Sequence, residues 1–338
     1  MYDLVIIGAG PAGISAAYEA KKAGLNYVVL EKGLIGNTVY NYPVGLTVFS
    51  TTNELEFIEG DLKPAREKPT REELLSYYVR FVLDNELNVR TEEPVIEVRT
   101  ADCGLRTGEA DKCYEVVTAK DVYKARNVLF AVGAMDHPRK LGVPGEELPK
   151  VHDHFRETYP WVRKKALVVG GGNSAGEAAL FLAQEGAETT LAIFRADWEN
   201  NDPKQGCIKY WVKQPLEEEL KEHCLNLFFL GKVIEIRETE VELESETGER
   251  VAIPNDVVFV LIGSDADLTM MKDLGVATEQ GKYGEIPVYD PATFETNVPG
   301  VFVAGHFTNQ RHIKGAIDAG PAVISAVTSK LSAISQTV

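Results

Sequence analysis

Two glycine-rich segments contain the residues whose types and spacing could do chemistry. The first places Gly8, Gly10 and Gly13 directly after the apolar run of residues 4–7 and ahead of alanines at helical spacing. A strand, turn and helix in this order let the backbone approach a pyrophosphate, which then faces the free N–H groups of the helix. Glu31 closes the next apolar run, where a carboxylate can accept hydrogen bonds from both ribose hydroxyls. The first segment therefore predicts a dinucleotide site.

The second segment repeats the arrangement with one change at its far end. Gly170, Gly172 and Ala175 follow the apolar run of residues 166–169, and alanine is tolerated in place of the third glycine. The second strand of this unit ends at Arg195, where the first unit has an acid. A guanidinium suits a 2′-phosphate and cannot replace a carboxylate toward bare ribose hydroxyls. NADP(H) is therefore favoured over NAD(H); the alternative is that Arg195 is only a solvated charge at a strand end.

The elements around these segments predict an α/β fold with two Rossmann-like, three-layer nucleotide-binding domains. Each glycine segment lies between an apolar strand and a helix, and a second strand follows the helix. Prolines and glycines punctuate residues 138–145, which predicts an extended linker. Elsewhere we expect a helix over 70–86, strands over 95–100, 114–118, 127–132, 257–262 and 300–305, and a final helix over 314–335.

Composition restricts the class of protein. The chain has 338 residues, of which 44% are hydrophobic, enough for two cores. A formal charge of −16 argues against a nucleic-acid partner, because such binding needs clustered Lys and Arg. The chain has no long apolar run and no basic leader, so we expect a cytoplasmic protein without a membrane partner. The spacing of its four cysteines, and of His152 and His154, predicts no metal site.

The motifs together resemble a known group of flavoproteins. The paired nucleotide segments, the Ala-Val-Gly sequence at 131–133 and the closing Gly-Val-Phe-Val-Ala-Gly at 300–305 resemble the low-molecular-weight thioredoxin-reductase-type flavoproteins. Further segments resemble one branch, the YpdA-type bacillithiol disulfide reductases; they are residues 31–33, 40–43, 49–51, 143–146, 148–151, 171–175 and 208–212. The resemblance covers nearly the whole chain.

The resemblance implies a thioredoxin-reductase-like architecture. An FAD domain over 1–138 and 268–338 would be interrupted by an NAD(P)H domain over 139–267, in a homodimer or higher homo-oligomer. The implied FAD residues are Gly8, Gly10, Pro11, Ala12, Gly13, Glu31, Lys32, Gly36, Asn37, Thr38, Tyr42, Val95, Ala131, Gly133, Gly305, His306, Lys314, Gly315 and Ala316. The implied NADP(H) residues are Gly170, Gly172, Asn173, Ser174, Ala175, Arg195 and Lys209.

Three departures from the family pattern leave the electron acceptor open. Ala12 stands where relatives assigned as reductases carry a cysteine in the first turn, and a methyl group cannot attack a disulfide. Residues 151–155 lack the Cys-x-x-Cys that thioredoxin reductases place ahead of the second turn. His306 replaces the aspartate that binds the ribityl chain of FAD, so we expect it to donate to the ribityl hydroxyls or to alter the flavin environment.

The leading hypothesis is an NADPH-dependent FAD oxidoreductase with a small-molecule or small redox-protein acceptor, a bacillithiol-type disulfide being the first candidate. An NADP reductase for ferredoxin or flavodoxin, without redox cysteines, is the alternative. A flavin monooxygenase, suggested by residues 154–161, and a non-catalytic redox sensor are further alternatives. The catalytic residues are unknown. Candidates are Cys207, otherwise a packed or surface thiol, and His154, otherwise an interdomain contact.

Overall fold

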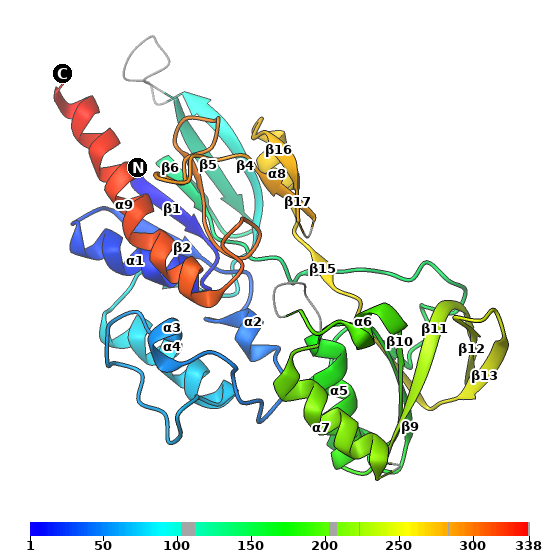
Figure 1. Ribbon diagram of the computed structural model, residues 1–338. Helices are drawn as coiled ribbons and strands as arrows, with labels where there is room; N and C mark the ends of the chain where they lie inside the picture. The colour runs from blue at the N-terminus through cyan, green and yellow to red at the C-terminus, as the bar shows by residue number, and fades with distance from the viewer. Residues whose placement is uncertain (103–111, 203–207, 223, 283, 337–338) are drawn as a thin grey trace. The chain divides into compact units, whose positions relative to one another are not determined.

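The computed structural model describes residues 1–102, 112–202, 208–222, 224–282 and 284–336 (Figure 1). The chain divides into two compact units. Unit 1 comprises Met1–Tyr40, Gly45–His137 and Asp265–Val338, and unit 2 comprises Asn41–Val44 and Pro138–Ser264. In the described part of the chain, no helix combines the length and the apolar character needed to cross a membrane.

Unit 1 is built on a seven-stranded sheet in the order β3-β2-β1-β6-β5-β4, with β18 also paired to β6. The pairs β3-β2, β2-β1, β1-β6 and β6-β18 are parallel, whereas β4, β5 and β6 are antiparallel. Its elements are β1 (Tyr2–Ile7), α1 (Pro11–Lys22), β2 (Tyr27–Leu30), α2 (Asn37–Tyr40), α3 (Thr52–Leu55), α4 (Arg71–Asp84), β3 (Val89–Arg90), β4 (Val95–Asp102), β5 (Lys112–Thr118), β6 (Val122–Phe130), α8 (Thr269–Asp273), β16 (Thr278–Gly281), β17 (Gly284–Pro287), β18 (Val301–Val303) and α9 (Ile313–Gln336).

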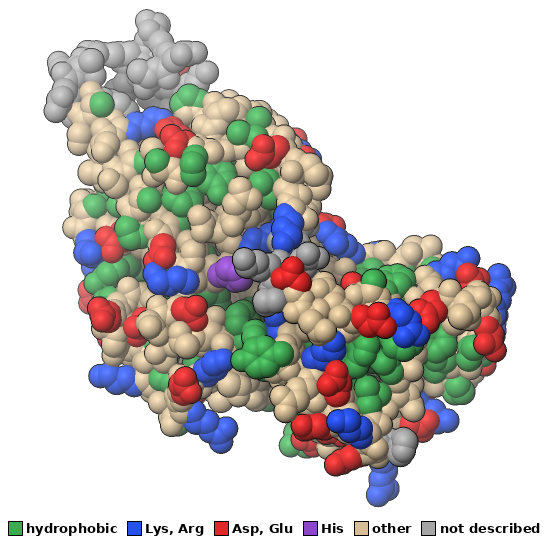
Figure 2. All heavy atoms as spheres, viewed as in Figure 1, with side chains coloured by type: hydrophobic (Ala, Val, Ile, Leu, Met, Phe, Trp, Pro, Cys, Tyr) green, Lys and Arg blue, Asp and Glu red, His purple; other side chains and the backbone are tan. Residues whose placement is uncertain are grey.

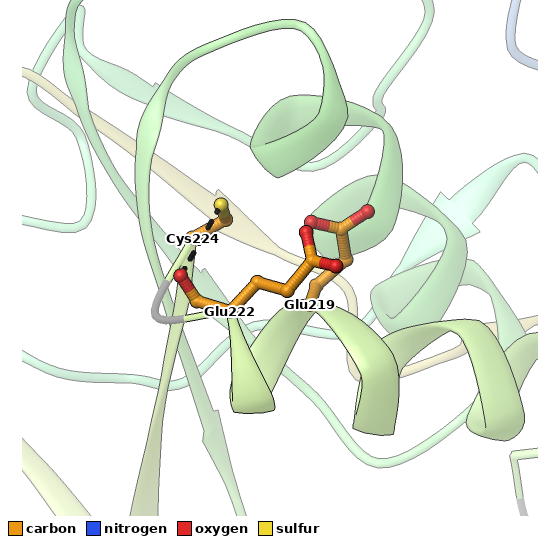
Figure 3. Close-up of side chains that lie close together, drawn as sticks. All are labelled: Glu219, Glu222 and Cys224. Carbon is orange, nitrogen blue, oxygen red and sulfur yellow. Dashed lines mark hydrogen bonds between the residues drawn. The ribbon is translucent and has the colours of Figure 1, made fainter.

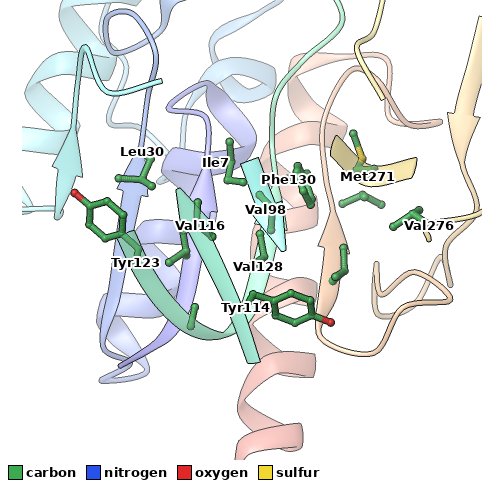
Figure 4. Close-up of a cluster of buried hydrophobic side chains, with 14 of the residues drawn as sticks. Ile7, Leu30, Val98, Tyr114, Val116, Tyr123, Val128, Phe130, Met271 and Val276 are labelled. Atoms are coloured by element: carbon green, nitrogen blue, oxygen red, sulfur yellow. The ribbon is translucent and has the colours of Figure 1, made fainter. Parts of the chain in front are cut away.

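The core of unit 1 explains why its central strands are almost wholly apolar. Helices α1 and α9 lie side by side (Figure 1), and Ser15 Oγ donates to the carbonyl of Ile317 over 2.7 Å. Another cluster of buried side chains joins β1, β2, β4, β5 and β6 to α8, which contributes Met271 (Figure 4). Strands buried on both faces need apolar residues at successive positions rather than at alternate ones.

Unit 2 contains a second seven-stranded sheet, in the order β13-β12-β11-β10-β9-β14-β8. Residues 225–229 of β11 pair in parallel with β10, and residues 230–236 pair antiparallel with β12. Its elements are β8 (Val151–His152), the 3₁₀ helix η2 (Tyr159–Trp161), β9 (Lys165–Val169), α5 (Asn173–Gln184), β10 (Glu188–Ile193), α6 (Arg195–Glu199), α7 (Tyr210–Lys221), β11 (Leu225–Ile236), β12 (Glu240–Ser245), β13 (Arg250–Pro254) and β14 (Val257–Val260). Two short strands, β7 (His137–Pro138) and β15 (Ser264–Asp265), pair with each other.

The sheet of unit 2 is covered on both faces. Helices α5 and α7 bury Ala178, Leu182 and Leu216 against one face. Side chains of β9 and β14 on the other face pack with Val233 and Val241 from β11 and β12. Both units therefore have the α/β fold that the sequence predicted. The antiparallel strands β11, β12 and β13, which extend the sheet of unit 2, were not predicted.

Candidate functional site

The first glycine turn joins β1 to α1 and leaves its backbone open to a ligand. Gly8 has φ +111°, and a Cβ there would overlap the carbonyl oxygen of Ala131. A Cβ at Gly13 would overlap the carbonyl oxygen of Gly8, so α1 can approach β1 only through a glycine. By contrast, nothing lies within 4 Å of a Cβ built on Gly10. Since no side chain caps α1, its first N–H groups point into this opening and suit a pyrophosphate.

Glu31 ties the end of β2 to this turn. Its Oε2 accepts the N–H of Ala9 and its Oε1 accepts the N–H of Gly33, each over 2.7 Å. The side chain is 6% exposed, and burial raises its pKa although both backbone bonds favour the charged form. Each carboxylate oxygen has two lone pairs, so each retains one acceptor position for a ribose hydroxyl. Lys32, also predicted at the ribose, forms a 2.8 Å ion pair with Asp136.

Several other residues predicted for FAD converge on the same turn. The N–H of Gly36 donates to the carbonyl of Ala9 over 2.9 Å, which fixes the start of α2 beside the turn. A Cβ built on Gly305 would lie 3.3 Å from the Cβ of Ala12, so the end of β18 packs against the turn as well. Val95 begins β4 two residues after Glu93, whose N–H donates to the carbonyl of Glu31. A single region of unit 1 thus collects these positions.

His306 and the N-terminus of α9 follow β18. His306 is exposed, but the protein atoms packed around its ring, together with the nearby charges of Arg311 and His312, lower its pKa to about 4. The imidazole is therefore neutral near pH 7 and can donate one hydrogen bond while accepting another. Lys314 is ion-paired with Asp318 one turn further along α9. The assignment of Gly133, Asn37 and Thr38 to the FAD site remains a prediction.

The second glycine turn joins β9 to α5 and has the same construction. Gly170 has φ +154°, and a Cβ there would overlap the carbonyl oxygen of Leu261, which directly follows β14, the strand beside β9. Nothing lies within 4 Å of a Cβ built on Gly172. Asn173 begins α5, and its Oδ1 accepts the N–H of Lys209 over 2.8 Å, which ties the turn to α7. Ala175 is fully buried. The opening at Gly172 suits the pyrophosphate of a second nucleotide.

Three acidic residues near this turn were not identified from the sequence. A Cβ on Gly171 would overlap the Asp197 carboxylate, so that carboxylate lies against the turn, where burial raises its pKa. Glu246 pairs with Arg195, and Glu177 lies on α5 two residues beyond Ala175. The pairing of Glu246 spans 51 residues of sequence, which no local motif could reveal. Asp197 lies two residues after Arg195, and this nearness was the one available indication.

Burial raises the pKa of Glu177 to about 7. The structure groups Asn41–Val44 with unit 2, where burial raises the pKa of Tyr42 and the Glu177 charge raises it further. This grouping differs from the predicted boundaries, which kept residues 41–44 in the FAD domain. Tyr42 is therefore close enough to Glu177 of α5 to sense its charge. Glu177 can hold or release a proton near neutral pH.

The catalytic candidates are placed only in part. His154 is exposed in unit 2, with its Nδ1 2.8 Å from Asp153 Oδ1. Cys207 lies outside the described residues. Of the described thiols, Cys113 is buried in β5, two strands from β1, and Cys224 is exposed in unit 2. Cys113 is therefore not positioned to act at the first turn.

Cys224 also belongs to a small cluster at the end of α7. Glu219, Glu222 and Cys224 place one potential metal ligand each within 4.8 Å of one another (Figure 3). Two of the three side chains are exposed, and the Cys224 thiol donates to the carbonyl of Glu222 over 3.7 Å. Exposed acidic groups of this kind are common without a metal, so the cluster alone indicates no function.

A separate pocket of about 500 Å³ lies at the other edge of the unit 2 sheet. It is lined by Lys150, Lys165, Glu238 and Asp256, and Lys150 Nζ donates to the buried Asn255 side chain over 2.6 Å. Lys165 begins β9, whereas the second glycine turn follows the end of this strand. The pocket is therefore separated from the nucleotide turn by the length of the strand, roughly 15 Å.

Most of the chain matches a known protein family. Residues 5–305 match the family described as pyridine nucleotide-disulphide oxidoreductase. The chain belongs to this family. It is therefore a flavin-dependent enzyme that uses a nicotinamide nucleotide. The match spans both glycine turns and confirms the resemblance to thioredoxin-reductase-like flavoproteins.

Three individual proteins are similar to this chain over most of its length. The chain is 35% identical over 301 residues to the bacilliredoxin reductase Bdr of Bacillus subtilis, covering 89% of this chain and 88% of the relative. It is 30% identical over 315 residues to a ferredoxin–NADP reductase of Ignicoccus hospitalis, covering 91% and 90%. The solved bacillithiol disulfide reductase Bdr (YpdA) from Staphylococcus aureus matches with a TM-score of 0.87 at 30% identity, covering 97% of this chain and 98% of that chain.

Proposed function

We propose that this enzyme binds FAD in unit 1 and NADPH in unit 2, and reduces a low-molecular-weight disulfide of bacillithiol type. One disulfide, one NADPH and one proton would yield two thiols and NADP⁺. The observation that carries this proposal is the pair of glycine turns, each with an uncapped helix N-terminus, one bounded by Glu31 and the other by Arg195. The similarity to the solved bacillithiol disulfide reductase Bdr from Staphylococcus aureus supports the disulfide as acceptor.

The residues of unit 1 fit FAD. Its pyrophosphate would lie over Gly10, and its adenosine ribose would bind the free acceptor positions of Glu31. The neutral His306 would donate to the ribityl chain, and the N-terminus of α9 would stabilise negative charge near the pyrimidine ring. Bound FAD supplies the transfer of two electrons from a hydride donor to the acceptor. The residues around it bind and orient it.

The residues of unit 2 fit a nicotinamide nucleotide. The open backbone at Gly172 and the N-terminus of α5 would hold the pyrophosphate, and Arg195 would hold the 2′-phosphate of NADPH. Glu177 and His154 are candidates for the proton that a departing thiolate needs. In the cytoplasm the protein would act as a homodimer or higher homo-oligomer.

Reduction without a thiol in the first turn is the chemical feature that most needs testing. Ala12 is 4% exposed and packs against Gly305, and Cys113 is buried in β5, two strands from β1. The disulfide would therefore receive electrons directly from the reduced flavin, or from a thiol elsewhere in the chain, of which Cys207 is the first candidate. Cys207→Ser decides between these routes, because only the direct route leaves disulfide reduction intact.

A second candidate acceptor is a small iron–sulfur or flavin protein. Ala12 favours it, because electron transfer to such a carrier needs no cysteine, and so does the similarity to a ferredoxin–NADP reductase. The formal charge of −16 opposes an acidic carrier, since like charges slow association.

The test is anaerobic and has two stages. NADPH is added to the holoenzyme and flavin bleaching is followed at the visible absorption band. Bacillithiol disulfide, oxidised thioredoxin or oxidised ferredoxin is then supplied. The proposal expects two thiols for each NADPH consumed with bacillithiol disulfide. Reoxidation only by ferredoxin would establish the second candidate, and no reoxidation by any acceptor would indicate a redox sensor.

A further inference from the structure

Arg195 is held on three sides by residues of unit 2. It begins α6 directly after β10, and its guanidinium carbon lies 3.7 Å from the centre of the Phe229 ring. Its Nε donates to both oxygens of Glu246, over 2.9 and 2.8 Å, and its Nη2 donates to the same carboxylate. Its Nη1 makes a longer contact of 3.4 Å with Glu199. The guanidinium is therefore oriented before any nucleotide arrives.

A backbone hydrogen bond holds Glu246 in place, in addition to its contact with Arg195. Glu246 follows β12, and its N–H donates to the carbonyl of Phe229 over 3.1 Å. Phe229 lies in β11, in register with Ile193 at the end of β10. The Phe229 ring thus lies on β11, and Arg195 and Glu246 follow the two strands paired with it, β10 and β12. Hydrogen bonding to Arg195 lowers the pKa of Glu246, so the carboxylate is charged at neutral pH.

This pairing competes with the ligand expected for Arg195. A guanidinium has five N–H donors and binds a phosphate best through two parallel hydrogen bonds. Glu246 takes Nε–H and one proton of Nη2, and Glu199 takes one proton of Nη1. Glu246 therefore occupies the Nε–Nη2 pair of donors, and the protons left on Nη1 and Nη2 lie beside a carboxylate that repels the incoming phosphate. The Asp197 carboxylate against Gly171 adds further negative charge on this side of the turn.

We propose that Glu246 sets the preference between NADPH and NADH, because its carboxylate occupies the Nε–Nη2 donor pair of Arg195 and places a negative charge where the 2′-phosphate would bind. This inference rests on the proposed function, in which unit 2 binds the nicotinamide nucleotide. The 2′-phosphate of NADPH must either displace Glu246 or bind beside its negative charge, whereas the 2′-hydroxyl of NADH meets neither cost. Discrimination in favour of NADPH is therefore weaker than an unpaired arginine would give.

The primary test measures binding with ligands that differ only in the phosphate. Adenosine 2′,5′-bisphosphate and 5′-AMP are titrated calorimetrically into the wild-type holoenzyme and into Glu246→Gln. The variant is expected to bind the bisphosphate about tenfold more tightly and 5′-AMP within twofold of wild type. The ratio of kcat/KM for NADPH to that for NADH is expected to rise about tenfold as well.

Glu199→Gln is the matched control. This substitution also removes one negative charge beside the Arg195 guanidinium, but it breaks only one long contact. The affinity of Glu199→Gln for the bisphosphate is therefore expected to change less than twofold. In an Arg195→Ala background the effect of Glu246→Gln is expected to disappear, because no guanidinium is then released.

Two results would overturn the inference. Weaker bisphosphate binding by Glu246→Gln would mean that Glu246 orients Arg195 for the phosphate instead of competing with it. An equal gain in both glutamine variants would assign the effect to net charge alone. The binding measurement needs no turnover, so it separates this inference from the proposed function, which is tested by flavin reduction and by reoxidation with a disulfide.

Discussion

Glu177→Gln is expected to stabilise the protein at pH 8 while changing its stability little at pH 5. Glu177 lies on α5 beyond the second glycine turn, and burial raises its pKa from an ordinary value of 4.5 to about 7. The folded protein therefore binds this proton more tightly than the unfolded chain does. The resulting stabilisation is fully present below pH 4.5 and is lost as the pH rises through about 7.

The size of the effect follows from the two pKa values. A rise from 4.5 to about 7 corresponds to roughly 3 kcal/mol between the fully protonated and fully ionised limits. Nearly all of this is lost at pH 8, and less than about 1 kcal/mol is lost at pH 5. Glutamine is isosteric and uncharged, so it avoids the cost of the buried charge. For a unit of this size the gain at pH 8 corresponds to roughly 5–10 °C in Tm.

Thermal unfolding of wild type and variant, followed by circular dichroism at pH 5 and pH 8, measures this difference. Glu185→Gln is the control, because Glu185 ends the same helix, is exposed and changes the net charge equally. Its effect on Tm is expected to be small and similar at both pH values. Two results would refute a carboxyl with a raised pKa at this position. One is equal stabilisation by Glu177→Gln at pH 5 and pH 8, and the other is a rise in Tm no larger than that of the control.

Three further outcomes concern the two glycine turns. Glu31→Ala removes the acceptors of the Ala9 and Gly33 N–H groups, so the dissociation constant for FAD, measured by fluorescence, is expected to rise at least tenfold. His306→Ala is expected to weaken FAD binding several-fold and by the same factor at pH 6 and pH 8, because a pKa of about 4 keeps His306 neutral throughout; unchanged affinity would argue against a hydrogen bond to FAD. Gly171→Ala would drive a methyl group into a neighbouring carboxylate, so nucleotide affinity is expected to fall about tenfold in titrations while FAD content stays normal.

Local sequence was sufficient for the elements that bind phosphate. A strand, glycine turn and helix are contiguous, so the positions of Gly10 and Gly172 follow from a few residues each. Glu31 directly follows the second strand of the first unit, whereas Arg195 begins α6 two residues after β10 and does not end the strand itself. The helix expected over residues 70–86 is α4, Arg71–Asp84, which begins at the capping box of Thr70 and Glu73. Such features depend on neighbours in sequence, and the pattern therefore predicts them.

The antiparallel pairing of β11, β12 and β13 could not be predicted from local sequence. Their polar and apolar residues alternate, as in Glu240–Ser245, but the partner of each strand is chosen by packing against β9 and β14. The acidic residues that modify the second turn depend on those choices. Glu246 reaches Arg195 only because β11 pairs with both β10 and β12.

The sequence by itself determined the two nucleotide turns, the family and the absence of a cysteine at position 12, because each is a property of short contiguous segments. The tertiary structure alone decided which charges surround those turns. It paired Arg195 with Glu246, and it buried Glu177 deeply enough to bring its pKa to about 7. Charge interactions and desolvation depend on distance and burial in space, and residues far apart in the chain supply both.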